Sequence, residues 1–249
     1  MQTYLDFVSL SSTNQRQFNR SSIMKTVLIT GANRGIGLKL TQLYLENGWQ
    51  VHATYREEQG AKQLFELKRD NLHCHQLDVT HYDKLPQFTA SLPTIDLLIN
   101  NAGYYGPKGT GFGDTQVEEW RKVFEVNTIA PLKFIEALYT NMRHSSYKKV
   151  VCISSKMASM EDNTSGAAYI YRSSKAALNS VVKSLSHDLA QDGITVLALH
   201  PGWVQTDMGG PNALLDTTTS AQGLMDVIER ADISSTGKFL NYDGTPLPW

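Results

Sequence analysis

The fold of this chain is decided by the stretch Thr26-Val27-Leu28-Ile29-Thr30-Gly31-Ala32-Asn33-Arg34-Gly35-Ile36-Gly37. Its first residues are apolar or β-branched, as in a buried strand, and a glycine-rich loop follows directly. Gly31 allows a tight turn after the strand, whereas Gly35 and Gly37 let the backbone approach a phosphate and let a helix pack on the sheet. The free N–H groups at the start of that helix would attract a pyrophosphate. Because strand, loop and helix occur in this order, a plain turn is the weaker interpretation.

Strand-like and helical patterns alternate along the rest of the chain. Strand-like runs are predicted at Thr26–Thr30, Gln50–Tyr55, Leu72–Leu77, Ile95–Asn100, Lys149–Ser154, Ile194–His200 and Lys238–Tyr242. One helix between them is expected to end at Gly48. A second is expected to be capped by Thr115, with Glu118 as its capping-box partner, and a third to run from about Ala167 to Gln191. The alternation predicts an α/β fold with a doubly wound, Rossmann-like parallel sheet in a single domain.

The composition excludes several classes of function. The 249 residues, of which 41% are hydrophobic and 19% charged, are enough for one α/β domain with a full core. The formal net charge of -1 gives no electrostatic attraction to nucleic acid or to an anionic membrane. No apolar run is long enough to span a bilayer. The expected partner is therefore a small molecule.

Two cysteines, Cys74 and Cys152, lie inside predicted strands, where core thiols are expected rather than a disulfide. Reduced thiols fit a reducing compartment, and the predicted location is cytoplasmic. The run His73-Cys74-His75 invites a metal site. Strand alternation places Cys74 on the face opposite the two histidines, however, and no further ligand cluster stands nearby, so no metal site is predicted.

Residues 1–23 differ in kind from the rest of the chain. They are rich in Ser, Asn, Gln and Arg, have no sustained apolar period and lack the features of a secretory signal. Met24 opens directly onto the first strand, so the prediction is a natural start at Met24 preceded by a disordered or misassigned extension. An organelle transit peptide is the alternative, which Asp6 and the short length weaken. The domain is predicted to cover residues 24–249.

A second informative segment is Tyr171-Arg172-Ser173-Ser174-Lys175. Tyr171 and Lys175 are one helical turn apart, so their side chains project from one face of a helix. An unperturbed tyrosine has a pKa near ~10, too high for easy proton exchange at neutral pH. A nearby cation favours the phenolate, so Lys175 is predicted to lower the pKa of this proton donor. Tyr169 is a rival donor, but the residue four positions on is Ser173, which carries no charge.

Four ordered motifs together resemble the short-chain dehydrogenase/reductase family, over about Lys25 to Trp249. They are Thr30–Gly37, Asn100-Asn101-Ala102-Gly103, Tyr171 with Lys175, and Pro201-Gly202. The resemblance implies a Rossmann-like sheet of roughly seven strands that binds NAD or NADP. It also implies that Asn101 and Gly103 border the adenine ribose and that Asp78 and Val79 hold the adenine. The implied cofactor-binding residues are Gly31, Asn33, Arg34, Gly35, Ile36, Gly37, Arg56, Asp78, Val79, Asn101, Ala102, Gly103, Tyr171, Lys175, Pro201, Gly202, Val204 and Thr206.

The same resemblance implies a set of catalytic residues: Asn127, Ser155, Tyr171 and Lys175. Ser155 matches the second serine of the family's Ser-Ser pair and would position the substrate oxygen, with Ser154 at the strand end as the alternative. The segment from Ser155 to Tyr171 is a few residues longer than in most members of the family. Asn127 matches the asparagine that helps hold a water in a proton relay to Lys175. Pro131, shortly after it, predicts a kink.

The end of the second strand decides between the two cofactors. An acidic residue there would accept the ribose hydroxyls of NAD and repel a 2′-phosphate. This chain has Tyr55-Arg56 instead, and Arg34 lies in the glycine loop. Two guanidinium groups could therefore converge on the 2′-phosphate. NADP is predicted, with NAD as the alternative.

Finer likenesses point to the C-factor/Sniffer-like carbonyl reductase branch of the family. They are found at Asp162–Gly166, Tyr171–Lys175, Thr206–Gly210 and Tyr242–Gly244. The implied function is NADPH-dependent reduction of an aldehyde, ketone or quinone to an alcohol, with Tyr171 as proton donor. The loop from about Thr206 to Ser220 is expected to act as a lid. Trp203, Met208 and Leu214 would form an apolar wall beside the substrate.

Two other functions are compatible with parts of the sequence. A non-enzymatic NADP(H)-binding sensor that signals to a protein partner is the main alternative, and the intact set of four catalytic residues argues against it. A sugar-nucleotide epimerase would need a longer C-terminal substrate domain and different glycine spacing. The sequence leaves open the substrate, the physiological direction and the oligomer, of which a homodimer is one form.

Overall fold

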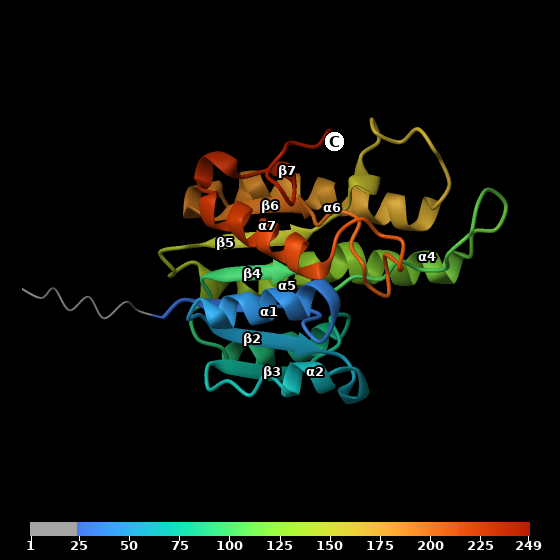
Figure 1. The fold of residues 1–249 in the computed structure, drawn as a ribbon. Coiled ribbons are helices and arrows are strands. Elements are labelled where there is room, and N and C mark those ends of the chain that lie inside the picture. Colours follow the sequence, from blue (N-terminus) through green and yellow to red (C-terminus); the bar gives the residue numbers. More distant parts are fainter. Residues whose placement is uncertain (1–23) are drawn as a thin grey trace, which may run out of the picture.

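The structure, a computed structural model, describes residues 24–249. The predicted extension, residues 1–23, lies outside the described residues. Seven strands form one sheet (Figure 1). They are β1 (Thr26–Ile29), β2 (Gln50–Tyr55), β3 (Leu72–Gln76), β4 (Leu97–Asn100), β5 (Lys149–Ile153), β6 (Thr195–His200) and β7 (Lys238–Asn241). Each of these strands lies within two residues of its predicted bounds.

The sheet is doubly wound, as predicted. Its order is β3-β2-β1-β4-β5-β6-β7, and every neighbouring pair is parallel. From β1 the chain moves outward to β3, then returns to β4 on the other side of β1 and moves outward again. Between β1 and β4 the direction of winding therefore reverses, and at such a point an open α/β sheet forms a crevice at its carboxyl edge.

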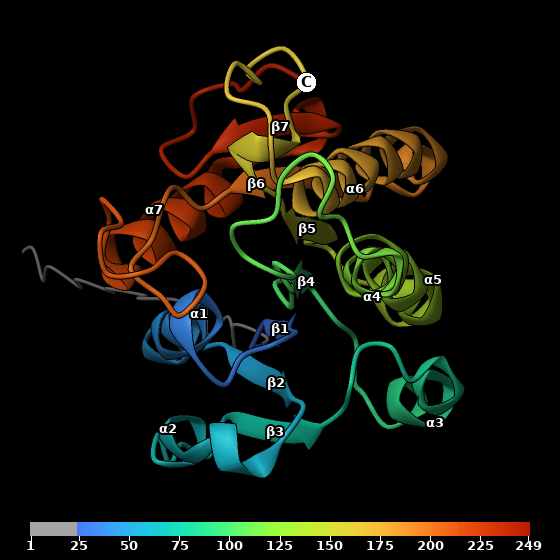
Figure 2. The ribbon, with the colours of Figure 1, turned by 90° about the vertical axis from the view of Figure 1, so that its right-hand side faces the viewer.

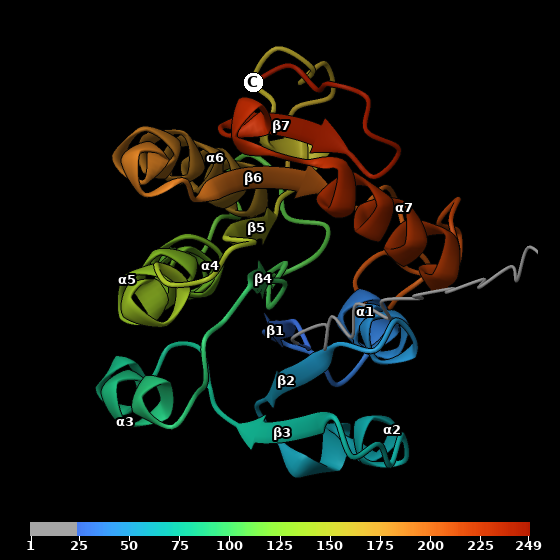
Figure 3. The same ribbon diagram turned by 90° about the vertical axis from the view of Figure 1, so that its left-hand side faces the viewer.

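Helices cover both faces of the sheet (Figures 2 and 3). One layer contains α1 (Gly35–Glu46), α2 (Lys62–Phe65) and α7 (Thr217–Arg230). The other contains α3 (Leu85–Ala90), α4 (Val117–Phe124), α5 (Ala130–Met142) and α6 (Tyr169–Asp188). Short 3-10 turns lie at Glu58–Gly60, Tyr82–Lys84, Lys156–Ala158, Ala190–Asp192 and Ile233–Ser235, and a π-helical segment, Glu125–Ile129, joins α4 to α5.

Each face of the sheet has its own hydrophobic core, because successive residues of a strand point to opposite faces. In β1, Val27 and Ile29 pack in the cluster that contains Leu40 of α1. Leu28 packs in the second cluster, with Phe134 of α5. All five side chains are completely or almost completely buried, and burying one of this size contributes about 1.5–3 kcal/mol. Burial on both faces explains the continuous apolar runs of central strands such as β1 and β4.

The helix ends agree with the predictions only in part. Gly48 follows α1 with a φ of 75°, which confirms its predicted place just beyond the helix. The long helix α6 begins at Tyr169, later than predicted, because Ala167 and Ala168 have positive φ angles of 53° and 48°. It ends at Asp188, before the 3-10 turn.

The predicted cap of α4 is wrong. Gln116 occupies the N-cap position, and its side chain makes no capping hydrogen bond. Glu118 lies in the first turn and pairs with Arg121 on the same exposed face instead of reaching back to Thr115. The helix begins one residue beyond the position that a Thr115 cap requires.

The histidines and the cysteine of β3 lie on opposite faces of the sheet, as predicted. Cys74 packs against the α1 side, whereas the Nε2 atom of His75 lies 3.0 Å from Nδ1 of His52 on the other face. Cys74 and Cys152 are both free thiols. In the part of the chain that the structure describes, no helix combines the length and the apolarity that crossing a bilayer requires.

Candidate active site

The glycine loop between β1 and α1 is shaped for close backbone approach. Gly31 has a φ of 63°, and a Cβ atom added to it would lie 2.9 Å from the Cα atom of Ala102. A Cβ atom on Gly37 would lie 2.4 Å from the carbonyl oxygen of Gly31. Contacts this short exclude any side chain at both positions. Arg34 is the N-cap residue of α1 and its side chain makes no capping bond, so the first N–H groups of the helix remain available to an anion.

The Asn100–Gly103 turn holds this loop in place from the end of β4. The Asn101 side chain donates from Nδ2 to the carbonyl oxygens of Thr30 and Gly31, both at 3.0 Å. In return, the Oγ1 atom of Thr30 accepts from the backbone N–H groups of Asn101 and Ala102. The two segments therefore form one rigid rim at the carboxyl ends of β1 and β4. The structure places the predicted cofactor residues of both motifs together at this rim.

Asp78 and Val79 follow β3 on the same edge of the sheet. Oδ1 of Asp78 accepts hydrogen bonds from the backbone N–H and the hydroxyl of Thr80, at 3.0 and 2.8 Å. Burial acts to raise the pKa of Asp78, but these hydrogen bonds outweigh it and lower the pKa below its ordinary value. The carboxylate is therefore ionised at neutral pH and available as an acceptor.

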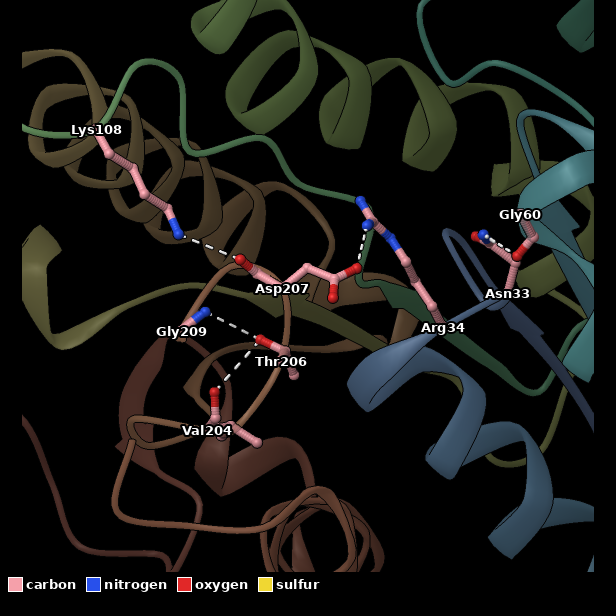
Figure 4. Close-up of polar contacts among 8 residues, drawn as sticks. All are labelled: Asn33, Arg34, Gly60, Lys108, Val204, Thr206, Asp207 and Gly209. Carbon is pink, nitrogen blue, oxygen red and sulfur yellow. Dashed lines mark hydrogen bonds and ion pairs between the residues drawn. The ribbon is translucent and has the colours of Figure 1, made fainter. Parts of the chain in front are cut away.

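The two predicted phosphate-binding arginines each pair with a carboxylate in this structure. Nη1 of Arg34 lies 2.5 Å from Oδ2 of Asp207 (Figure 4). Nε of Arg56 lies 3.0 Å from Oε1 of Glu57. All four side chains are well exposed, so each pair contributes less than about 1 kcal/mol. Breaking these pairs therefore requires little free energy, and the guanidinium groups can bind a more strongly charged anion instead.

The segment Pro201–Asp216 after β6, called here the β6–α7 loop, crosses the glycine loop. A Cβ atom on Gly35 would lie 3.2 Å from Cγ2 of Thr206, so the two loops approach closely. The carbonyl oxygen of Asp207 accepts from Nζ of Lys108 at 3.2 Å (Figure 4). Val204 and Leu215 form a β-bridge at the base of the loop. Two chain segments from opposite sides of the crevice therefore hold the loop across it.

Several predicted residues of the loops support one another. Oγ1 of Thr206 accepts from the backbone N–H of Gly209 at 3.1 Å and lies 3.3 Å from the carbonyl oxygen of Val204 (Figure 4). The side chain of Asn33 donates to the carbonyl oxygen of Gly60 at 2.9 Å. The three residues of the predicted apolar wall, Trp203, Met208 and Leu214, are exposed side chains of the β6–α7 loop.

Tyr171 and Lys175 lie together on the buried side of α6. Nζ of Lys175 donates to the carbonyl oxygen of Ile153 at 2.8 Å and lies 5.9 Å from the centre of the Tyr171 ring. Tyr169, the rival donor, points outward and is 41% exposed. The predicted register of this helix therefore puts Tyr171, and not Tyr169, at the sheet edge.

The two serines at the end of β5 have different surroundings. Ser155 lies beside the Tyr171 phenol, and its Oγ accepts from the backbone N–H of Met157 at 3.1 Å. Ser154 donates instead to Oδ1 of Asn179 at 2.6 Å, within the buried layer under α6. Only Ser155 is therefore placed to share a substrate oxygen with Tyr171.

Asn127 lies in the π-helical segment between α4 and α5, close to the predicted kink at Pro131. Its side chain is completely buried and forms a pair of hydrogen bonds with the backbone of Tyr104, both at 2.8 Å. Its Nδ2 also donates to the hydroxyl of Ser174 in α6 at 3.0 Å. A π-helical turn inserts an extra residue into the helix, which lets the Asn127 side chain project inward here.

Burial dominates the electrostatics of the site. Desolvation raises the pKa of Tyr171 to about 12, with Ser155 acting to lower it and Tyr105 to raise it. Desolvation also lowers the pKa of Lys175 to about 8. The expected net lowering of the Tyr171 pKa is wrong for this structure, because the pKa is raised. The ammonium group points to the Ile153 carbonyl, and the loss of water around the phenol has the larger effect.

Two residues near the site, Tyr105 and Asp207, are not among the predicted site residues. The Tyr105 ring stacks on the Tyr171 ring, with centroids 4.5 Å apart and planes at 27°. Asp207 pairs with Arg34 although the two are far apart in the sequence. Neither contact has a periodic or local signal. The only hint for Tyr105 is its position two residues after the Asn100–Gly103 motif.

Comparisons with known proteins agree with this geometry. The short chain dehydrogenase family model matches residues 25–214. The chain is 42% identical to C-signal of Myxococcus xanthus over 155 residues, which are 62% of this chain and 93% of that protein. Carbonyl reductase Sniffer of D. melanogaster superposes with a TM-score of 0.87 at 34% identity, covering 91% of this chain and all of that one. The NADPH-bound carbonyl reductase from chicken fatty liver superposes with a TM-score of 0.85 at 34% identity, covering 91% of this chain and 94% of that one. With its doubly wound sheet and its glycine loop, this chain belongs to the short-chain dehydrogenase family.

Proposed function

We propose that the protein is an NADPH-dependent reductase that converts the carbonyl group of an aldehyde, ketone or quinone into an alcohol. The observation that carries the proposal is the convergence of Tyr171, Ser155 and Lys175 at the carboxyl edge of the sheet, where Lys175 lies close to Gly103 of the Asn100–Gly103 turn. Carbonyl reduction needs a hydride and a proton on opposite atoms of one double bond. The convergence supplies the groups that handle the proton.

Tyr171 is proposed as the proton donor. A phenol whose pKa is raised to about 12 is protonated at neutral pH, which is the state that reduction requires. Ser155, beside it, would hold the carbonyl oxygen within reach of the phenol. Lys175 would stabilise the phenolate left after the transfer, because its ammonium lies on the same helix face. Asn127 would keep Tyr171 in place through Ser174, whose Oγ donates to the Tyr171 carbonyl oxygen at 2.8 Å.

The residues of the crevice fit NADP. The backbone at Gly31 and Gly37 leaves no space for side chains, as a pyrophosphate cradle requires, and the start of α1 offers N–H groups. Asp78 would accept from the adenine. Arg34 and Arg56 would hold the 2′-phosphate in place of their present carboxylate partners. When bound, the nicotinamide supplies the hydride. Structures similar to this chain include several short-chain reductases with bound NADP or NADPH.

A signalling role is the second candidate, favoured by one observation: the relative with 42% identity is named C-signal. In that case the protein would bind NADP(H) without turnover. The complete set of Asn127, Ser155, Tyr171 and Lys175 supports the enzyme, since a sensor has no need of a buried proton donor. A cytoplasmic location and a homodimer stay predictions.

Substitution at Tyr171 tests the reductase. NADPH oxidation is followed with a panel of aldehydes, ketones and quinones, for the wild type and for Tyr171→Phe. The variant keeps the buried ring and loses the proton donor, so activity falls about 10²- to 10⁴-fold while NADPH binding persists. Tyr169→Phe is the matched control and changes little. A dead Tyr169→Phe enzyme with an active Tyr171→Phe enzyme would overturn the assignment, and a wild type inactive on the whole panel would favour the sensor.

A further inference from the structure

The stack of Tyr105 on Tyr171 covers one side of the proposed proton donor. Tyr105 lies in the loop between β4 and α4 and is partly buried. Its ring is nearly parallel to that of Tyr171, with centroids 4.5 Å apart. No substrate fits between rings at this distance. Tyr105 therefore blocks this face of the Tyr171 ring, and a carbonyl compound that reaches the hydroxyl lies beside the stacked pair and not between its rings.

The backbone on the N-terminal side of Tyr105 is fixed by Asn127. The amide of Asn127 accepts from the N–H and donates to the carbonyl oxygen of Tyr104, both at 2.8 Å. A completely buried amide with both bonds satisfied is costly to displace. Tyr104 itself points its hydroxyl to Glu119, so the two neighbouring rings have separate surroundings.

The backbone on the C-terminal side of Tyr105 is fixed by Gly106. Its φ is 81°, and a Cβ atom there would lie 3.0 Å from Cγ2 of Val123 and 3.6 Å from Cγ2 of Ile170. The chain can run this close to α4 and α6 only with a glycine in the left-handed conformation. The backbone of Tyr105 is thus constrained on both sides, and its ring stacks on Tyr171 from this position.

The same network reaches Tyr171. Nδ2 of Asn127 donates to Ser174 Oγ, and Ser174 Oγ donates to the carbonyl oxygen of Tyr171. One buried side chain therefore fixes both the loop that carries Tyr105 and the helix turn that carries Tyr171. A shared anchor of this kind keeps the two rings in register with each other.

We propose that Tyr105 is a positioning and specificity-determining residue: its ring holds Tyr171 in place and gives the substrate site a flat aromatic side that favours planar, conjugated carbonyl compounds. This inference rests on the proposed function. An aryl ketone, an enal or a quinone can lie flat along the edge of the stacked pair and gain aromatic contacts. A carbonyl between bulky tetrahedral groups cannot approach as closely.

Three substitutions separate the parts played by the ring and by the hydroxyl. Tyr105→Ala removes the stacked ring, and Tyr105→Leu keeps much of the side-chain volume without an aromatic ring. Tyr105→Phe keeps the ring and should retain the selectivity of the wild type. Tyr104→Phe is the control on the neighbouring ring. For each enzyme, kcat and KM are measured with one planar aryl or quinone substrate and one bulky aliphatic ketone, across pH.

In the Ala and Leu variants, the ratio of kcat/KM for the planar over the bulky substrate is expected to fall about two- to tenfold, the worth of one aromatic pair. The alkaline limb of the pH profile moves downward, because water reaches the phenol and the raising influence of Tyr105 is lost. An unchanged ratio and an unmoved limb in both variants would overturn the inference. Two variants guard against one that fails to fold.

A second measurement distinguishes failure of this inference from failure of the proposed function. The ionisation of Tyr171 is titrated by tyrosinate absorbance, as the difference between each protein and its Tyr171→Phe partner. A wild type without turnover on any carbonyl overturns the function and the selectivity together. The titration then still decides the positioning role: a Tyr171 pKa that is the same in Tyr105→Ala and wild type overturns it, and a lower one supports it.

Discussion

Lys175→Met should reduce the rise in the free energy of unfolding that the wild type shows between about pH 8 and about pH 10. Lys175 is 4% exposed, and burial lowers its pKa from 10.5 to about 8. Between these values the unfolded chain holds the proton that the folded chain releases. Protonation of Lys175 therefore favours the unfolded chain. The free energy of unfolding is highest above pH 10.5 and decreases as the pH falls towards 8. This difference in pKa between the unfolded and the folded chain changes the free energy of unfolding by about 3 kcal/mol over the whole range. About 2 kcal/mol of that change falls between about pH 8 and about pH 10.

The assay is urea unfolding of the wild type and the variant at those two pH values. Wild type should gain about 2 kcal/mol more on the rise in pH than Lys175→Met, since methionine keeps the volume and has no proton to lose. Lys183→Met, on an exposed turn of the same helix, is the control and should follow the wild type. Equal gains in wild type and Lys175→Met would show that the ammonium is not desolvated as the geometry requires.

The same variant has a second, catalytic readout. Losing the cation removes the group that favours the phenolate of Tyr171, so the alkaline limb of the rate profile should move upward and cofactor binding should weaken. An unchanged profile beside the expected change in stability would assign Lys175 a purely structural place.

Two further predictions concern the cofactor and the β2–β3 face. Arg56→Asp should weaken NADPH binding about tenfold to a hundredfold and narrow its advantage over NADH, measured by fluorescence titration; a wild type that already prefers NADH would contradict the specificity reasoning. Burial, together with His75 and His73, lowers the pKa of His52 from 6.5 to about 4. Stability from this group is complete above pH 6.5 and declines by up to about 3 kcal/mol as the pH falls to 4. His52→Gln should remove that decline in unfolding measurements, and parallel curves for the two proteins would refute it.

The strands could be predicted because burial on both faces leaves a continuous apolar run, as in β1 and β5. Helix starts were harder. The signal for α6 begins with Ala167 and Ala168, which favour helix by composition but take left-handed angles in the loop. Thr115 and Glu118 have the spacing of a capping box, yet Glu118 pairs with Arg121 on the exposed face. In both places tertiary contacts, and not local helix propensity, determine where the helix begins.

The residues of the candidate site could be predicted from the sequence where they lie in short motifs. Tyr171 and Lys175 share a helix face by spacing alone, and strand alternation separates Ser154 from Ser155. Contacts between distant segments had no such signal. The stacking of Tyr105 depends on the conformation at Gly106 and on the amide of Asn127, and neither can be read from residue order.

The contacts of the β6–α7 loop determine how easily it can move away from the crevice. Apart from its β-bridge at Val204 and Leu215, the loop is tied across the crevice by the Arg34–Asp207 pair and by the Lys108 hydrogen bond, both on the surface. Two such surface bonds together are worth about 1–1.5 kcal/mol, so releasing the tip of the loop from them requires little free energy. The bridge at the base can stay formed while the tip swings. Exchange of a dinucleotide therefore calls for a local and frequent fluctuation, and the sheet beneath it need not change.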